Sequence, residues 1–286
     1  MAKTQHLKRR IRSVRNTMQV TKAMKMISAA RLRKAQDRII AARPFANRGF
    51  AVLRSLASRA NPELHPLLQV RPMRRLDVVV VAADRGLCGS FNANILRTAA
   101  TFIADRPDAE VFVSAVGRKA VDYFRKRRYT LRREWTDVFR RLEFPVAETI
   151  GQDLIGRYAS GESDATYVVY NEFKSTMQQS PVIERLLPID MRALEGGQPP
   201  SQDYIYEPSA AALFERLLPR HVEVQVFRGL LESAAAEHAA RMTAMDSATS
   251  NAGELIDRLT LKMNRVRQAS ITTELIEVVS GAQALG

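Results

Sequence analysis

Chemistry could be centred on one short stretch, DRGLCGSFN at residues 84–92, which holds the only cysteine of the chain, Cys88. It follows an apolar run and opens a helical pattern, and phosphate ligands often bind at such a turn in doubly wound α/β folds. The stretch lacks the G-x-G-x-x-G spacing and the Lys-Ser/Thr pair of a P-loop, so its nucleotide-binding signal is weak. We expect a tight structural turn whose glycines serve conformation, with a cysteine or nucleotide enzyme as the alternative.

The histidines add no site to this stretch. His6, His65, His221 and His238 are dispersed along the chain, and none is close to Cys88 in sequence. They have no metal-ligand spacing, and Cys88 has no local base to activate it as a nucleophile. We therefore expect no catalytic residue, no metal and no cofactor.

Composition is that of a folded, soluble protein of 286 residues, 46% hydrophobic and 26% charged, long enough for one large domain or two smaller ones. A single cysteine excludes an internal disulfide and fits a reducing compartment. No run of 18 apolar residues is present, so no membrane span is expected. The basic start, MAKTQHLKRRIRS, is not followed by the apolar core of a secretory signal.

The positive charge is concentrated at one end. Residues 1–60 carry 16 of the 44 Lys and Arg residues but a single acid, Asp37, so they hold a charge of +15. The net charge of the chain is +14, so the remaining residues sum to −1. A long-range electrostatic partner would therefore be acidic and would meet the first segment.

The last third of the chain reads as one long helix. Twelve positions follow one another at unbroken spacings of three and four, as in a coiled-coil seam. They are Phe227, Leu231, Ala234, His238, Met242, Met245, Thr249, Ala252, Ile256, Leu259, Met263 and Val266. A helix over 220–280 would be roughly 90 Å long at 1.5 Å per residue. Pro219 is expected to kink or break it near its start.

The first segment has a matching pattern in two parts. One stripe begins at Leu7, Ile11, Val14 and Met18, and a second contains Leu32, Ala35, Ile39, Ala42, Ala46, Phe50, Leu53 and Ala57. Between them, Thr21, Met24, Ile27 and Ser28 keep the register poorly, so a stutter is expected there. Pro44 is expected to bend this helix locally.

The middle of the chain alternates strand and helix patterns. Strands are expected at 76–84, 110–116, 164–173 and 180–189, with helices at 90–105, capped by Ser90 or Asn92, at 117–127 and near 144–161. The predicted fold class is α/β with long helices: an antiparallel coiled coil of the terminal helices plus a central doubly wound α/β domain. The expected parts are a coiled-coil helix at 1–60, the α/β domain at 61–192, a connecting loop at 193–208 and a second coiled-coil helix at 209–286.

The C-terminal end is apolar on too many sides for water. After Val266 the stripe slips by one residue and resumes at Ile271, Leu275, Val278, Ala282 and Leu285, while Ile276 and Val279 add apolar surface on neighbouring faces. Such a helix must be enclosed. The first helix is too short to enclose it, so other chains are expected to form a sleeve around it.

A basic first helix also fits a module that binds nucleic acid. Residues 1–44 contain no aromatic side chain to stack on bases, and an apolar seam already commits one face to a partner helix. We favour a basic face turned toward acidic protein, with nucleic-acid binding as the alternative.

The stretch ITTELIEVVSGAQA at 271–284 resembles the signature of the gamma subunit of F-type ATP synthases, I-T-x-E-x-x-[DE]-x-x-x-G-A. Its fixed positions are filled by Ile271, Thr272, Glu274, Glu277, Gly281 and Ala282. EHAARMTAMDSATSNAGELI, NTMQVTKAMKMISAARLRKAQ and DRGLCGSFN resemble other parts of the same family. Pro219 departs from the family's uninterrupted second helix.

The resemblance implies a rotary shaft without catalytic chemistry. The terminal helices would stand inside a ring of three alpha and three beta subunits, with the middle domain near the epsilon subunit and the c-ring. The shaft would couple ion-driven rotation of the c-ring to conformational change at the beta subunits. It would lie on the cytoplasmic face of a bacterial plasma membrane, attached only through the c-ring and without nucleic acid.

The resemblance also implies three sets of contact residues. Contacts with the ring would involve Met24, Arg241, Gln268, Thr272 and Glu274. A foot near epsilon and the c-ring would involve Tyr204, Tyr206 and Glu207 in DYIYEP. Ile271, Leu275 and Val278 would form a bearing tip. For each set, packing within the coiled coil or plain solvent exposure is the alternative.

Overall fold

The structure is a computed structural model that describes residues 2–57, 65–190 and 209–283. The chain divides into two compact units. We call Met1–Ser28 with Arg241–Gly286 the terminal unit, and Ala29–Ala240 the central unit. Two long helices, α1 (Ala2–Ala57) and α6 (Ala210–Gln283), contribute to both units.

In the terminal unit, α1 and α6 pair in opposite directions. The hydroxyl of Thr21 lies 2.8 Å from that of Thr249, and Lys25 Nζ lies 2.6 Å from Asp246 Oδ1. A step forward along α1 therefore corresponds to a step backward along α6, which confirms the predicted antiparallel pairing. All twelve predicted seam positions of α6 are buried or half-buried.

The predicted stutter in α1 is wrong. Thr21 and Ser28 are 9% and 2% exposed, and Met24 between them is half-buried, so the spacing of three and four continues. Ile27 lies outside this seam and is exposed. Short hydroxyl side chains fill the seam here because their polar atoms are satisfied: Thr21 donates to the Met18 carbonyl oxygen and shares a hydrogen bond with Thr249.

Neither proline ends its helix. Pro44 lies inside α1 and Pro219 inside α6, which begins at Ala210, within one residue of the start expected for the second long helix. The predicted break at Pro219 is therefore wrong. Phe214 and Leu218, in the turn before the proline, are buried, so packing holds a turn that has lost one backbone hydrogen bond.

The central unit contains a five-stranded sheet in the order β3-β2-β1-β4-β5. The strands are β1 (Arg75–Val81), β2 (Glu110–Val116), β3 (Leu131–Trp135), β4 (Ala165–Phe173) and β5 (Gln179–Leu187). The first four are parallel, and β5 is antiparallel to β4. The other helices are α2 (Phe91–Ala104), α3 (Arg118–Lys126) and α4 (Phe144–Ala159), with 3-10 turns at Pro66–Leu68 and Val138–Arg140.

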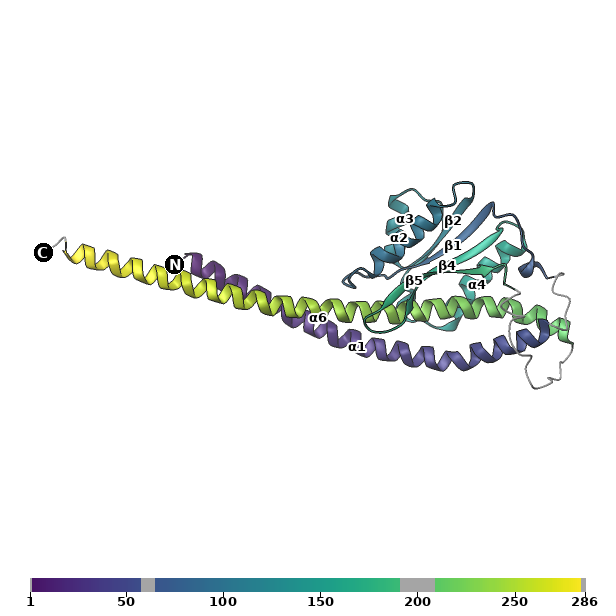
Figure 1. Ribbon diagram of the computed structural model, residues 1–286, viewed down its shortest axis with the longest axis horizontal. Helices are drawn as coiled ribbons and strands as arrows, with labels where there is room; N and C mark the ends of the chain where they lie inside the picture. The colour runs from purple at the N-terminus through teal and green to yellow at the C-terminus, as the bar shows by residue number, and fades with distance from the viewer. Residues whose placement is uncertain (1, 58–64, 191–208, 284–286) are drawn as a thin grey trace. The chain divides into compact units, whose positions relative to one another are not determined.

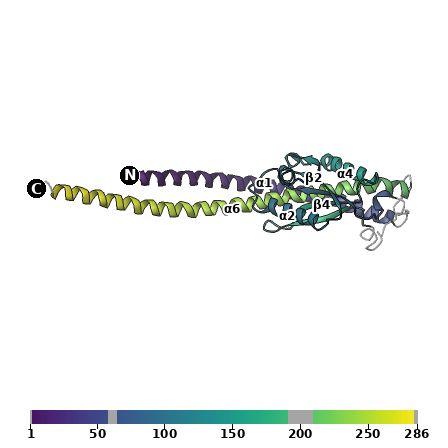
Figure 2. The same cartoon turned by 90° about the horizontal axis from the view of Figure 1, so that it is seen from above.

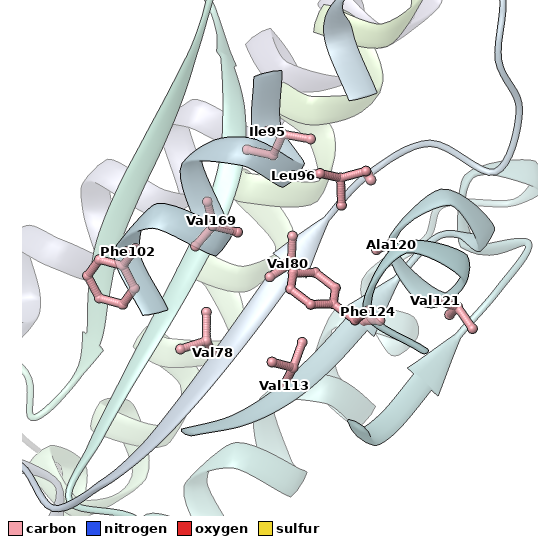
Figure 3. Close-up of a cluster of buried hydrophobic side chains, with 13 residues drawn as sticks. Val78, Val80, Ile95, Leu96, Phe102, Val113, Ala120, Val121, Phe124 and Val169 are labelled. Atoms are coloured by element: carbon pink, nitrogen blue, oxygen red, sulfur yellow. The ribbon is translucent and has the colours of Figure 1, made fainter. Parts of the chain in front are cut away.

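Helices cover both faces of this sheet, as expected for a doubly wound fold. α2 and α3 lie on one face, while α4 and α6 lie on the other (Figures 1 and 2). The first face packs through a buried apolar cluster in which Val80 and Val113 of the strands meet Ile95 of α2 and Phe124 of α3 (Figure 3). The predicted fold class is confirmed.

Strand β3 was missed in the sequence because its pattern is nearly polar throughout. Its five residues, LRREW, are half-buried or exposed, as fits an edge strand, and the ladder to β2 shifts register between Val113 and Ser114. The other edge strand, β5, tolerates Pro181 for a related reason, since an edge strand can spare a backbone donor.

Candidate functional site

The C-terminal part of α6 is exposed to water along its whole length in the described part of the chain. From Arg267 to Ser280 every side chain is exposed except that of Ser270, which is half-buried. The segment contains no proline or glycine, and two threonine hydroxyls donate to carbonyl oxygens one turn earlier: Thr272 to Gln268 and Thr273 to Ala269. It therefore remains helical without tertiary support.

The predicted bearing residues share one face of this exposed helix. Ile271, Leu275 and Val278 are 48%, 60% and 69% exposed. Ile276 and Val279 are also mostly exposed and widen the apolar surface. Monomeric soluble proteins rarely present contiguous apolar surface of this kind unless it binds something.

The predicted ring-contact residues on this segment point in two directions. Thr272 and Gln268 are one turn apart, and the Thr272 hydroxyl is 3.0 Å from the Gln268 carbonyl oxygen. Because the proton of that hydroxyl is already donated within the helix, the hydroxyl oxygen can only accept a hydrogen bond from a partner. Glu274 is two residues further along, about 200° around a helix of 3.6 residues per turn. Its exposed carboxylate makes no hydrogen bond or ion pair within the described residues.

The other two predicted ring-contact residues also belong to the terminal unit but lie outside the exposed end of α6. Met24 is half-buried on α1, beside Lys25, whose ammonium forms an exposed ion pair with Asp246. Arg241 is only 8% exposed, so little of its guanidinium is available to a partner. Sequence reasoning missed the Lys25–Asp246 pair, which follows only from the pairing register of the two helices.

The predicted foot residues, Tyr204, Tyr206 and Glu207, lie outside the described residues, as does the predicted connecting loop at 193–208. Their role stays a prediction.

Residues 84–92 form a closed turn. Asn92 ties it together: its Oδ1 accepts the Ala83 N–H at 3.0 Å, and its Nδ2 donates to the Arg85 carbonyl oxygen and to Cys88 Sγ. Asn92 therefore does not cap α2, and Ser90, which occupies the cap position, makes no capping hydrogen bond with its side chain. Leu87 and Gly89 both have left-handed φ values, 61° and 56°, as a tight turn requires.

The carboxyl ends of β1 and β4, where a doubly wound fold usually binds its ligand, are filled by α6. Cys88 is 1% exposed and packs in a buried cluster with Phe91 and with Ala236 of α6, against which Phe173 also packs. The thiol is therefore shielded and the crevice is closed by the chain itself. Among the described residues no group of histidines, cysteines and acids could hold a metal ion.

The described helices include none that is long and apolar enough to span a bilayer.

A family model and individual relatives of this chain point to the same family. The model of a family described as ATP synthase matches residues 3–285. The ATP synthase gamma chain of Anaeromyxobacter sp. (strain Fw109-5) is 50% identical over 290 residues, covering 100% of both chains. That of Geobacter sp. (strain M21) is 48% identical over 287 residues, covering 100% of this chain and 99% of the relative.

Solved structures with low sequence identity share the fold. A chain of the Euglena gracilis mitochondrial ATP synthase (OSCP/F1/c-ring, rotational state 3) matches with a TM-score of 0.71 at 19% identity, covering 99% of this chain and 95% of that one. A chain from the central stalk and c-ring of the Tetrahymena thermophila mitochondrial enzyme matches with a TM-score of 0.61 at 24% identity, covering 80% and 99%.

Proposed function

Because the chain belongs to the family of ATP synthase gamma chains, we propose that its two long helices are the central shaft that couples ion-driven c-ring rotation to the beta subunits. The resemblance noted in the sequence is thereby confirmed. A gamma chain is a non-catalytic subunit, which agrees with the buried thiol and the filled crevice at the end of β1.

The exposed apolar tip carries the proposal. Ile271, Leu275 and Val278 lie on a helix that the described residues of the chain leave uncovered, so a sleeve from other subunits would lower its free energy. We propose that alpha and beta subunits, three of each, supply this sleeve. The tip would then be a bearing, because an apolar surface has no directional bonds to break as it turns.

The polar contacts would be angle-dependent. Thr272 with Gln268, and Glu274 about 200° away, would face different subunits of the ring at any one rotor angle. Turning the shaft would exchange these contacts among the three beta subunits and so favour different conformations at each. Met24 would add an apolar contact lower on the shaft, and Arg241 would contribute through the small part of its side chain that is exposed.

The rest of the assembly follows from the same family. Residues 61–192 would form the domain nearest the membrane together with Tyr204, Tyr206 and Glu207 of the 193–208 loop, in contact with the epsilon subunit and the c-ring. The helices at 1–60 and 209–286 would form the coiled coil. The complex would sit on the cytoplasmic face of a bacterial plasma membrane and hold this chain there through the c-ring, without nucleic acid.

Purification of the tagged chain from its native cells tests the proposal. Alpha and beta subunits should copurify, and the complex should hydrolyse ATP and pump ions, whereas the chain alone should not hydrolyse ATP. Recovery with ribosomes or bare nucleic acid instead would overturn it. ATP turnover by the isolated chain that is lost in Cys88→Ser would revive an enzyme at 84–92.

A further inference from the structure

Two glycines lie in the central unit where α6 packs directly against the α/β part. A Cβ on Gly151 of α4 would lie 2.9 Å from Cγ and 3.2 Å from Cα of Glu223, closer than such atoms normally approach. A Cβ on Gly229 of α6 would lie 3.4 Å from the ring of Tyr170, in ordinary van der Waals contact, so a methyl group fits there and a branched side chain would press against the ring. Side chains of ordinary size at both positions would push α6 away.

On the sheet side, further contacts hold the Tyr170 ring in position against Gly229. Tyr170 of β4 is 1% exposed, and its hydroxyl donates to Glu184 Oε2 on β5 at 2.9 Å. Glu184 Oε1 lies 3.8 Å from Arg228 of α6. Tyr170 on β4 therefore contacts α6 at Gly229, and its partner Glu184 on β5 contacts α6 again at Arg228. Burial raises the pKa of Tyr170, so the hydroxyl keeps the proton that it donates.

A second contact on this side uses the end of β4. β1 pairs with β4 only as far as Val169, and Phe173 lies beyond that point. The carboxylate of Glu232 on α6 accepts the Phe173 backbone N–H at 3.0 Å. A charged acceptor makes this a stronger bond than one between neutral groups.

On the α4 side, Gly151 is flanked by charged pairs. Arg220 of α6 donates to Glu148 of α4 at 3.1 Å and to Glu223 at 3.0 Å. Its guanidinium also lies over the ring of Phe144, 4.0 Å from the centroid. Glu223 is 5% exposed, so its carboxylate is largely shielded from water at this close crossing of α4 and α6, while the side chains of Arg220 and Glu148 remain 40% and 39% exposed.

The two contacts hold different faces of α6. Glu223 and Gly229 are six residues apart, which is about 240° around the helix. If α6 rolled about its axis, Glu223 would leave Gly151 and the Gly229 surface would leave Tyr170 together. The arrangement therefore resists rotation of α6 within the central unit more than a single contact face would.

We infer that these contacts form a torque lock, in which Gly151, Tyr170, Gly229 and Glu232 position the shaft against the α/β domain. This inference rests on the proposed function. Force applied to the α/β domain would reach the shaft through the lock, so the four residues act on coupling without touching a nucleotide. They are positioning residues.

Paired variants in the reconstituted complex test the lock. Gly151→Ala forces α4 from α6, while Gly156→Ala, on the same helix with nothing within 4 Å of its Cβ, is the matched control. Gly229→Val displaces the Tyr170 ring, and Gly229→Ala, which fits, is the control. We expect both disruptive variants to hydrolyse ATP but to pump about twofold fewer ions per ATP, with both controls unchanged.

Glu232 provides a milder test should the glycine variants fail to assemble. Glu232→Ala should lower the ions pumped per ATP and speed hydrogen exchange of the Phe173 amide, and Glu232→Gln, which keeps an acceptor, should restore much of both. A lower melting temperature with an unchanged ratio in Glu232→Ala would overturn the lock, as would unchanged ratios in both disruptive glycine variants. Absence of ATP-driven pumping with the unaltered chain would instead count against the proposed function.

Discussion

His221 is a half-buried base whose protonation opposes folding. It lies on α6 with its ring 5.6 Å from the ring of Phe50 on α1. Burial lowers its pKa from 6.5 to about 4. Between these values the unfolded chain binds the proton and the folded chain does not, so stability falls as pH drops from 6.5 toward 4. Above pH 6.5 the histidine is neutral in both states and imposes no penalty.

A substitution that keeps a ring but removes the titration should flatten this profile. For His221→Phe we expect the fall in unfolding free energy between pH 7 and pH 5 to be smaller by about 2 kcal/mol than in the unaltered chain. Urea denaturation of the free chain at the two pH values measures it. Equal pH dependence in both chains would mean that His221 is not neutral in the folded state.

Glu274 should act on rotation and not on folding. Its carboxylate is exposed and makes no ion pair or hydrogen bond within the described residues, so Glu274→Ala removes no internal contact. We expect unchanged helix content and assembly, with lower ATP turnover or fewer ions pumped per ATP in the reconstituted complex. Failure to assemble would make Glu274 structural, and a complex with wild-type turnover and pumping would remove it from the ring contact.

The tip of α6 is the element whose stability depends most on partners. Burying Leu275 and Val278 in a sleeve should be worth roughly 1.5–3 kcal/mol for each side chain. Backbone amides in 268–280 should therefore exchange quickly with deuterium in the free chain and slowly in the complex. Equal protection in both states would show that the tip needs no sleeve.

Among the elements, those with a strong hydrophobic period could be predicted and those fixed by tertiary contacts could not. The seam of α6 can be recognised because burial repeats with the helical period, and β1 because a strand buried on both faces is a continuous apolar run. Strand β3 has no such pattern, since Arg132 and Arg133 are both charged although Arg132 is half-buried and Arg133 is exposed. The expected break at Pro219 does not occur, because packing of Phe214 and Leu218 outweighs the local effect of the proline.

The same limit applies to the candidate site. The family motif identified the exposed tip, and the apolar positions there need no structure to be recognised. That Thr272 and Glu274 point to opposite sides follows from helix geometry once the segment is known to be helical. Burial of Arg241 could not be predicted, because a charged residue in a seam gives no sign in one sequence of which neighbours cover it.

At the scale of the whole molecule, charge is arranged for association. The first 60 residues carry the basic excess, and Lys8, Arg9 and Arg10 are all exposed on α1. These side chains bury nothing, so their role would be to attract an acidic partner before contact. Salt screens such attraction over about 8–10 Å at physiological strength. We therefore expect the charge to act on the rate of assembly more than on the fold.

Neutralising Lys8, Arg9 and Arg10 to glutamine tests this expectation against a control of equal charge. Lys126, Arg127 and Arg128, at the end of α3, are three exposed cations of the central unit, and their neutralisation changes net charge by the same amount. The first triple variant should slow reconstitution with alpha and beta subunits at low salt and differ little from the unaltered chain at high salt. The control should slow it less, because the basic excess that would attract an acidic partner is concentrated in residues 1–60. A defect in the first variant that persists at high salt would mean lost packing, and equal slowing by both variants would mean that only net charge matters.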